Sequence, residues 1–253
     1  MSGTLVVNEI YLSLQGESTF AGLPCVFVRL TACNLRCSYC DTAYAFTEGR
    51  RRPSDEVREE VLRLAATFAS EALPVVPIAG GGRHRLPLVE FTGGEPLLQP
   101  EAAAVMRRLC DDGFTVLVET SGAHDISVLD PRVRRIMDLK APSSGEESRN
   151  RWENLGHLAA TDEVKLVLGT DEDYAWAKGI LGQHRLAERC PVLVSWVAPL
   201  VDGQRHASLK PVPAGHHPIS RRELADRIIA DRLPVRFQLQ MHKFVWAADA
   251  RGV

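Results

Sequence analysis

Three cysteines fall within one short run of this chain, and their spacing restricts the possible chemistry more than any other segment does. The run is Cys33-Asn-Leu-Arg-Cys37-Ser-Tyr-Cys40. Such a loop supplies three thiolates, whereas a structural zinc site takes four protein ligands and an ordinary four-iron cluster takes four cysteines. Three thiolates on a four-iron cluster would leave one iron open to a further ligand. A zinc knuckle that borrows a distant histidine, or three unrelated buried thiols, are alternatives that the spacing leaves open.

A glycine-rich segment follows the cysteine loop at the end of the next predicted strand. The apolar run 88–91 predicts a short buried strand, and it continues directly into Thr92-Gly93-Gly94-Glu95-Pro96. Adjacent glycines let a backbone approach a ligand closely, and Glu95 is an acceptor for a cationic group. By itself this segment is typical of an ordinary strand-to-helix turn. Its position about one β-α unit after the cysteines is something that a zinc knuckle does not explain.

Length and composition are those of an ordinary globular enzyme. Of the 253 residues, 45% are hydrophobic and 25% are charged, and the formal net charge is −2. This balance gives no reason to expect nucleic acid or a membrane surface as a partner. Neither a secretion signal nor an apolar stretch of roughly 20 residues for a membrane helix is evident. We therefore expect one cytoplasmic domain over residues 1–253, in which Cys25, Cys110 and Cys190 are reduced and buried.

Strand and helix signals alternate along the chain. Strands are predicted at 25–31, 88–91, 114–118, 135–139, 163–168, 191–196 and 235–239, while helices between 141 and 162 stay uncertain. One helix begins at Ser54, and a second lies between Pro100 and Gly113. A third follows the capping box Ser220-Arg-Arg-Glu223 and bears Leu224, Ile228 and Ile229.

This order of elements predicts an α/β fold with a parallel sheet curled into a full or partial (β/α) barrel. The Pro-, Gly- and Arg-rich residues at about 70–87 are expected to form an exposed excursion from it. Ligands of such folds gather at the C-terminal ends of the strands. The cysteine loop, the segment 93–95 and the segment 119–122 all fall at such ends, so we expect them to share one site.

The cysteine loop together with Gly93-Gly94-Glu95 resembles the radical S-adenosylmethionine (SAM) superfamily. That resemblance implies that Cys33, Cys37 and Cys40 hold a [4Fe-4S] cluster whose open iron binds SAM. It also implies that the aromatic residue before the last cysteine, Tyr39, lies near the adenine.

Within that superfamily, the whole chain closely resembles the 7-carboxy-7-deazaguanine synthase family. The matching segments are Glu9-Ile-Tyr-Leu-Ser-Leu-Gln-Gly-Glu17, Cys40-Asp41-Thr42, Glu119-Thr120-Ser121-Gly122, Asp138-Leu139-Lys140 and Leu239-Gln240-Met-His242-Lys243. The resemblance implies a lyase that converts 6-carboxy-5,6,7,8-tetrahydropterin to 7-carboxy-7-deazaguanine with loss of ammonia, on the route to queuosine and related 7-deazapurines. It further implies a barrel shortened in its helices, Mg²⁺, a homodimer, and an electron donor such as flavodoxin or ferredoxin.

The resemblance also implies roles for individual residues. Thr42 would offer an oxygen to Mg²⁺, a cation that prefers oxygen ligands. Contacts with SAM are implied for Tyr39, Gly94, Glu95, Ser121, Asp138, Lys140 and Ser195. Contacts with the substrate are implied for Leu14, Gln15, Gly16, Glu17, Arg29, Thr92, Glu119 and His242.

Several of these roles have ordinary structural alternatives. The planar fork of Arg29 suits a carboxylate, but an ion pair is equally open. Glu119 could hold an internal lysine, Ser195 could be a buried hydroxyl, and His242 could be structural. Many relatives carry Asn at the position of Ser121, and Ser-Pro at the two positions before Lys140. The chain also continues beyond His242 to Val253, which leaves the role of its last residues open.

Two further functions remain as alternatives. A glycyl-radical-enzyme activase would share the cysteine loop and the Gly-Gly-Glu segment but would not form deoxyadenosine with the carboxypterin. A non-catalytic iron–sulfur or zinc interaction module would leave Tyr39 and the segment 93–95 without an explanation.

Overall fold

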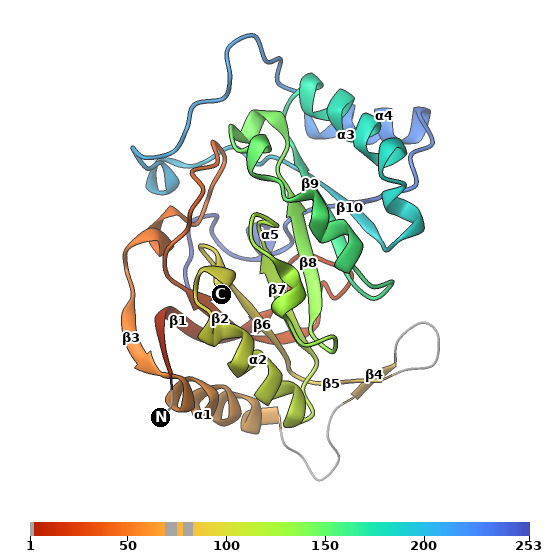
Figure 1. The fold of residues 1–253 in the computed structure, drawn as a ribbon. Coiled ribbons are helices and arrows are strands. Elements are labelled where there is room, and N and C mark those ends of the chain that lie inside the picture. The colour runs from red at the N-terminus through yellow and green to blue at the C-terminus, as the bar shows by residue number, and fades with distance from the viewer. Residues whose placement is uncertain (1–2, 69–74, 78–82) are drawn as a thin grey trace.

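The fold is built around a curved sheet of nine strands (Figure 1). The computed structural model describes residues 3–68, 75–77 and 83–253. The strand order is β11-β10-β9-β8-β7-β6-β2-β1-β3, so β11 and β3 are free edges and the barrel is not closed. The strands are β1 (Thr4–Leu14), β2 (Pro24–Leu30), β3 (Arg50–Pro53), β6 (Leu88–Gly93), β7 (Val116–Thr120), β8 (Arg134–Leu139), β9 (Glu163–Leu168), β10 (Val192–Trp196) and β11 (Arg236–Gln238).

The parallel part of this sheet confirms the prediction, and the N-terminal part departs from it. Strands β2, β6, β7, β8, β9, β10 and β11 run parallel in that spatial order. The sequence did not predict β1 or β3, which pair antiparallel at the edge of the sheet. These strands are only partly buried and mix polar with apolar residues, so they lack the continuous apolar run of a buried parallel strand.

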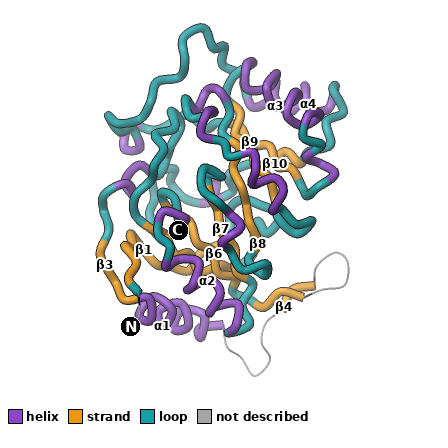
Figure 2. Tube along the Cα trace, in the orientation of Figure 1, coloured by secondary structure: helices purple, strands orange, loops and turns teal. Residues whose placement is uncertain are grey.

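The α-helices in the described part of the chain are few, as the predicted shortening of the barrel requires. They are α1 (Ser54–Ala65), α2 (Glu101–Asp111), α3 (Asp171–Gln183), α4 (Arg221–Ala230) and α5 (His242–Val245). Only short 3₁₀ turns connect β7 to β8 and β8 to β9, so no α-helix lies between 141 and 162. Figure 2 shows the helices in purple among the teal loops and orange strands. Ser220 caps α4 as predicted, but Ile229 is 75% exposed because consecutive helical positions face different directions.

The two faces of the sheet have different roles. On the outer face, side chains such as Val26, Val28, Val89 and Phe91 pack in the main core with residues of the helices. On the inner face, Phe27, Leu88, Leu117 and Ile136 form a smaller apolar cluster. Side chains two residues apart in a strand share a face. The residues two positions after these four therefore also point inward, and they are Arg29, Glu90, Glu119 and Asp138. The inner face therefore changes from apolar to charged toward the C-terminal ends of the strands.

The sequence predicted an exposed excursion at about 70–87. The structure describes residues 75–77 and 83–87 of it, and some of these are buried. Strands β4 (Val75–Pro77) and β5 (Arg83–Arg85) pair antiparallel there, and residues 69–74 and 78–82 lie outside the described ranges. His84 and Leu86 are buried rather than exposed, because Leu86 joins the inner apolar cluster and His84 bonds Thr115. Within the residues that the structure describes, no helix is long and apolar enough to span a membrane.

Candidate active site

A cavity of about 620 Å³ opens at the C-terminal ends of the strands, where the sequence predicted a shared site. Its wall includes the cysteine loop, the segment after β6, the end of β7 and the C-terminal residues. The predicted site residues that line it are Leu14, Gln15, Gly16, Glu17, Arg29, Cys33, Cys37, Tyr39, Cys40, Thr42, Thr92, Gly94, Glu119, Ser121, Asp138, Lys140 and His242.

The start of the cysteine loop is fixed against the Gly-Gly segment. The chain leaves β2 through Ala32, which has a left-handed φ of 79°. The backbone N–H of Gly94 donates to the carbonyl of Leu30 at 3.1 Å, and that of Glu95 donates to Ala32 at 2.8 Å. A Cβ at Gly93 would lie 2.2 Å from the Leu30 oxygen, and one at Gly94 would lie 2.0 Å from the Ala32 oxygen. Both glycines line the cavity, but they are required because the chain's own backbone passes so close.

The middle of the cysteine loop is anchored by the segment after β8. The Glu146 carboxylate accepts from the backbone N–H of Arg36 at 2.6 Å and is 2.9 Å from the Lys210 ammonium. Ser38 donates its hydroxyl to the Ser143 carbonyl at 2.7 Å. Contacts on both sides therefore hold the loop in place before any ligand binds.

The surroundings of the three loop cysteines fit a cluster better than a thiol core. All six cysteines are free, and only those at 33, 37 and 40 line the cavity. Burial raises the pKa of each loop thiol, that of Cys40 to about 12, so thiolates here need a nearby positive charge such as cluster iron. The Tyr39 hydroxyl and one Asp138 oxygen are buried beside this region without a hydrogen-bond partner, which leaves polar groups for a bound ligand. No three His, Cys, Asp or Glu side chains in the described part of the chain gather closely enough for a single metal ion.

Two residues predicted to contact SAM do not line the cavity. Glu95 is fully buried, and its carboxylate accepts from Leu97 N–H at 2.9 Å, from the Thr120 hydroxyl at 2.8 Å and from Ser121 N–H at 2.7 Å. It therefore ties the segment after β6 to the end of β7. Ser195 is buried and accepts from the Gln238 amide at 3.1 Å, which is the buried-hydroxyl alternative.

A largely buried network of three glutamates and one lysine forms one wall of the cavity. The Lys165 ammonium on β9 is 2.7 Å from a Glu17 oxygen and also pairs with Glu119. Glu119 accepts from the Thr92 hydroxyl at 3.2 Å, so it holds an internal lysine and still reaches a predicted substrate residue. Gln15, which is almost fully buried, donates to Glu90 at 2.6 Å.

The charges in this network are unequal. Burial acts to raise the pKa of Glu17, but Lys165, His242 and Gln240 together outweigh it and the pKa is lowered. Burial raises the pKa of Glu119 even with Lys165 beside it. Burial, with the Glu119 charge nearby, raises the pKa of Glu90 to about 8. Near neutral pH, Glu90 is therefore held largely protonated, and this wall can both donate and accept hydrogen bonds.

Arg29 lies in the cavity wall and is also part of an ion pair. Its Nε is 2.8 Å from a Glu9 oxygen, and its Nη2 donates to the Tyr11 hydroxyl at 2.7 Å. The guanidinium also lies 5.8 Å from the centre of the Tyr44 ring. These contacts orient the guanidinium but leave Nη1 without a partner among the residues described.

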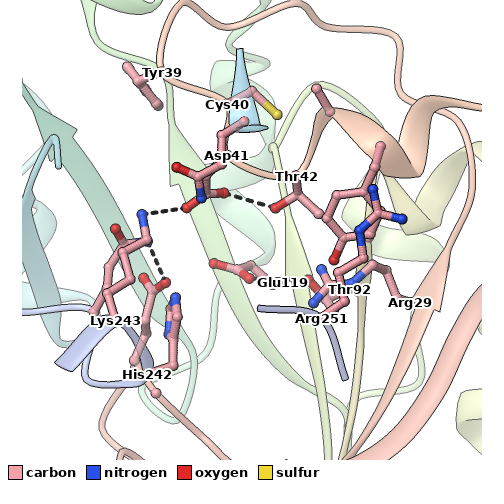
Figure 3. A pocket seen from close by; sticks show the side chains of 18 of the residues that line it. Arg29, Tyr39, Cys40, Asp41, Thr42, Thr92, Glu119, His242, Lys243 and Arg251 are labelled. Carbon is pink, nitrogen blue, oxygen red and sulfur yellow. Dashed lines mark hydrogen bonds and ion pairs between the residues drawn. The ribbon is translucent and has the colours of Figure 1, made fainter. Parts of the chain in front are cut away.

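The end of the cysteine loop is joined to the C-terminal helix α5. Thr42 donates its hydroxyl to Asp41 at 2.8 Å, and the other Asp41 oxygen is 2.6 Å from the Lys243 ammonium (Figure 3). Burial acts to raise the pKa of Asp41, but Lys243, Thr42 and His242 together outweigh it, so the pKa is lowered and this carboxyl stays ionised. The neighbouring His242 packs against Gly16, where a Cβ would lie 2.4 Å from the imidazole Nδ1. Oxygen ligands for a cation are therefore present at Thr42 and Asp41.

Sequence reasoning missed several residues of this cavity. Asp41 and Lys243 stand inside motifs that were noted, but their pairing joins segments about 200 residues apart in the chain. The sequence could have indicated Glu90 and Lys165, because each is a charged residue within a largely apolar parallel strand. Such a residue is expected to have a buried partner or a ligand.

Comparison with known proteins places this cavity in a family. The profile of the Radical SAM superfamily matches residues 28–142. The chain is 41% identical to 7-carboxy-7-deazaguanine synthase of Koribacter versatilis over 250 residues, which cover 98% of this chain and 99% of that protein. It is 39% identical to 7-carboxy-7-deazaguanine synthase of Chlorobaculum tepidum, covering 98% of this chain and 97% of that protein.

A solved structure shares the fold. The crystal structure of QueE from Escherichia coli superposes with a TM-score of 0.64 at 18% identity, covering 94% of this chain and 95% of that chain. The open, mixed sheet is therefore a known arrangement of strands.

Proposed function

The chain belongs to the 7-carboxy-7-deazaguanine synthase family of radical SAM enzymes, and from this premise we propose how its cavity acts. The proposed reaction is a carbon–nitrogen lyase reaction that converts 6-carboxy-5,6,7,8-tetrahydropterin to 7-carboxy-7-deazaguanine with loss of ammonia. Full-length relatedness to proteins of that name argues against the activase and the non-catalytic module.

The observation that carries this proposal is the polarity of the cavity beside the three cysteines. Figure 3 draws Arg29 and Thr92 on one side of Glu119, and His242 and Lys243 on the other. A carboxypterin has a carboxylate at one end and a guanidine-like edge of N–H donors at the other. Arg29 offers donors to the carboxylate, and the glutamate wall offers acceptors to the edge. The cavity therefore presents complementary groups to both ends of one flat molecule.

When bound, the cluster and SAM would supply radical chemistry, and the residues of the cavity would position SAM and the pterin for it. Thiolates from the cysteine loop would hold the cluster. Lys140, which is 2.7 Å from Asp138, would place a positive charge near the cluster and SAM. Tyr39, Gly94 and Ser121 line the same region of the cavity, and we propose that they contact SAM.

The substrate would be oriented by groups that the fold has already fixed. Glu17 and Glu119 are held by Lys165, so their acceptor oxygens need no rearrangement when the substrate arrives. The protonated carboxyl of Glu90 secures Gln15, which in turn accepts from the backbone N–H of Glu17 at 2.5 Å. Prepositioned groups of this kind lower the cost of ordering a substrate for reaction.

We assign a Mg²⁺ site to Thr42, whose oxygen meets the cation's preference for hard ligands. Replacing Thr42 with alanine is expected to reduce product formation strongly while iron content and SAM binding stay near those of the wild type, because the cysteine ligands are unchanged. Iron analysis, SAM binding and product formation over a Mg²⁺ titration check this. Wild-type turnover that is indifferent to added Mg²⁺ and to chelation would contradict the assignment.

Arg29 provides the sharpest test of the substrate. Anaerobically reconstituted enzyme with SAM, Mg²⁺ and carboxypterin is expected to form the deazaguanine product. Replacing Arg29 with lysine removes the planar fork, so carboxypterin binding is expected to weaken about ten- to a hundredfold. Uncoupled SAM cleavage is expected to persist, since the cysteine loop is untouched. The measurements are product formation, the KM for carboxypterin and deoxyadenosine release.

The matched ligand control is tetrahydropterin without the 6-carboxylate. The wild type is expected to bind it poorly, and the change at Arg29 is expected to make little further difference. If the lysine variant binds carboxypterin as well as the wild type does, Arg29 serves only its ion pair with Glu9. If the wild type forms no product from carboxypterin, the proposed reaction is wrong.

The remaining parts of the proposal concern the enzyme's surroundings. We propose a cytoplasmic homodimer that receives electrons from a small donor such as flavodoxin or ferredoxin. A proposed single domain over residues 1–253 is supported by the nine-stranded sheet, which contains both β1 and β11.

A further inference from the structure

The C-terminal segment, residues 247–253, forms part of the cavity wall, although no motif of the sequence predicted a role for it. Every residue of this segment lines the cavity, and Figure 1 places the C-terminus among the strand ends. The side-chain amide of Gln204 donates to the Ala248 carbonyl at 2.7 Å and holds the segment in place. Arg251 is the cationic residue that the segment brings to the cavity.

Arg251 shares an aromatic surface with Arg29. Its guanidinium carbon lies 3.9 Å from the centre of the Tyr44 ring, and that of Arg29 lies 5.8 Å from the same ring. The Tyr44 hydroxyl donates to the Glu9 oxygen that also accepts from Arg29 Nε. One tyrosine therefore places two guanidinium groups in the same part of the cavity, whose labelled residues include Arg29 and Arg251 in Figure 3.

Arg251 has one ion-pair partner in the described part of the chain, Glu48, which uses only one of its guanidinium nitrogens. Its Nη1 is 2.6 Å from one Glu48 oxygen, and both side chains are about half exposed, at 51% and 54%. Ion pairs this exposed contribute little to stability and are readily exchanged. No other hydrogen bond from this guanidinium reaches a residue of the described ranges. Arg251 can therefore accept an anionic ligand without breaking a buried contact.

Arg29 alone cannot satisfy all the hydrogen-bond acceptor positions of a substrate carboxylate. Its Nε is committed to Glu9 and its Nη2 to Tyr11, whereas a carboxylate has about four acceptor positions on two oxygens. A second guanidinium in the same part of the cavity can satisfy the remaining positions.

We propose that Arg251 is a substrate-binding residue that holds the substrate carboxylate together with Arg29. This inference rests on the proposed function, since it requires a substrate with a carboxylate. In the absence of substrate, Arg251 lies over the Tyr44 ring and pairs with Glu48, the partner that the carboxylate would replace.

The test compares Arg251→Gln with Glu48→Gln in the anaerobically reconstituted enzyme with SAM bound. The readouts are the KM for carboxypterin and calorimetric binding of 7-carboxy-7-deazaguanine, which needs no turnover. Arg251→Gln is expected to weaken both at least about tenfold, because a hydrogen-bonded charge is lost. Glu48→Gln is expected to leave both unchanged or to strengthen them, because it removes a competing partner. Arg251→Lys is expected to lie between the wild type and Arg251→Gln.

Two controls separate a binding role from a structural one. Arg222 on α4 is 91% exposed and is not among the residues that line the cavity, so Arg222→Gln is expected to match the wild type. Binding of 7-deazaguanine, which lacks the carboxylate, is expected to be the same in the wild type and in Arg251→Gln.

The outcomes distinguish this inference from the proposed function. If the wild type is active and Arg251→Gln behaves like the wild type, Arg251 does not bind the carboxylate. Equal weakening by Arg251→Gln and Glu48→Gln, or equal weakening toward 7-deazaguanine, makes their ion pair a structural contact and overturns the inference. If the wild type neither binds nor converts the carboxylated compounds, the proposed function and this inference both fail.

Discussion

Replacing any one of Cys33, Cys37 and Cys40 with alanine is expected to abolish SAM cleavage. Each thiol lines the cavity at the end of the sheet, and three thiolates are the minimum that holds a four-iron cluster with one open iron. Removing one leaves too few ligands to keep the cluster in place. Iron analysis and the EPR spectrum of the reduced protein, with and without SAM, together with deoxyadenosine release, check the result.

The other three cysteines are matched controls. Cys25, Cys110 and Cys190 are free and buried within the apolar parts of the fold, away from the cavity lining. Alanine at each is expected to leave SAM cleavage intact, because the change removes only a small buried sulfur atom. Zinc in place of iron after anaerobic reconstitution would exclude the cluster altogether.

Among the substitutions proposed, replacing Lys165 with methionine is expected to cause the largest loss in the free energy of unfolding. This lysine is 5% exposed and pairs with both Glu17 and Glu119, whose side chains are 14% and 27% exposed, so its removal leaves two largely buried carboxylates without a counter-charge. Breaking a buried pair in this way costs about 3–5 kcal/mol, which corresponds to a fall in Tm on the order of 10 °C for a domain of this size. Anaerobic thermal unfolding of the reconstituted protein measures it.

The loss is expected to depend on pH with a defined sign. Without Lys165, burial raises the folded-state pKa of Glu17 above its unfolded value, as it already does for Glu119. A carboxyl with a raised folded-state pKa stabilises the fold below its unfolded pKa, and this stabilisation is lost as pH rises through the folded pKa. The variant is therefore expected to fall further below the wild type at pH 8 than at pH 5.

An exposed lysine provides the matched control. Lys178 is 2.7 Å from Asp231, but its side chain is 44% exposed, so Lys178→Met is expected to cost within about 1 kcal/mol. A loss at Lys165 no larger than that at Lys178 would show that water already screens the glutamates, and the proposed preorganisation of the substrate wall would be wrong.

Much of the fold could be read from the chain because its signals are local. The apolar runs of the parallel strands predicted β6 and β9 closely, and the capping box at Ser220 predicted the start of α4. Strand β1 could not be predicted in the same way, since a partly buried antiparallel strand carries a mixed pattern of polar and apolar residues. Burial of Leu86 was also missed, because it depends on packing against β7 and β8 rather than on its neighbours in the chain.

The residues of the site can also be divided into those that local sequence predicted and those that only the tertiary structure brought together. Residue spacing by itself determined the cysteine loop at 33–40 and the glycine segment after β6, because a few consecutive residues carry that chemistry. Only the tertiary structure decided what Glu95 binds, that Lys165 joins Glu17 to Glu119, and that residues 247–253 enter the cavity. The reason is that these contacts depend on the register of the parallel sheet and on the path of the last residues across its strand ends. Neither is encoded in the spacing of neighbouring residues.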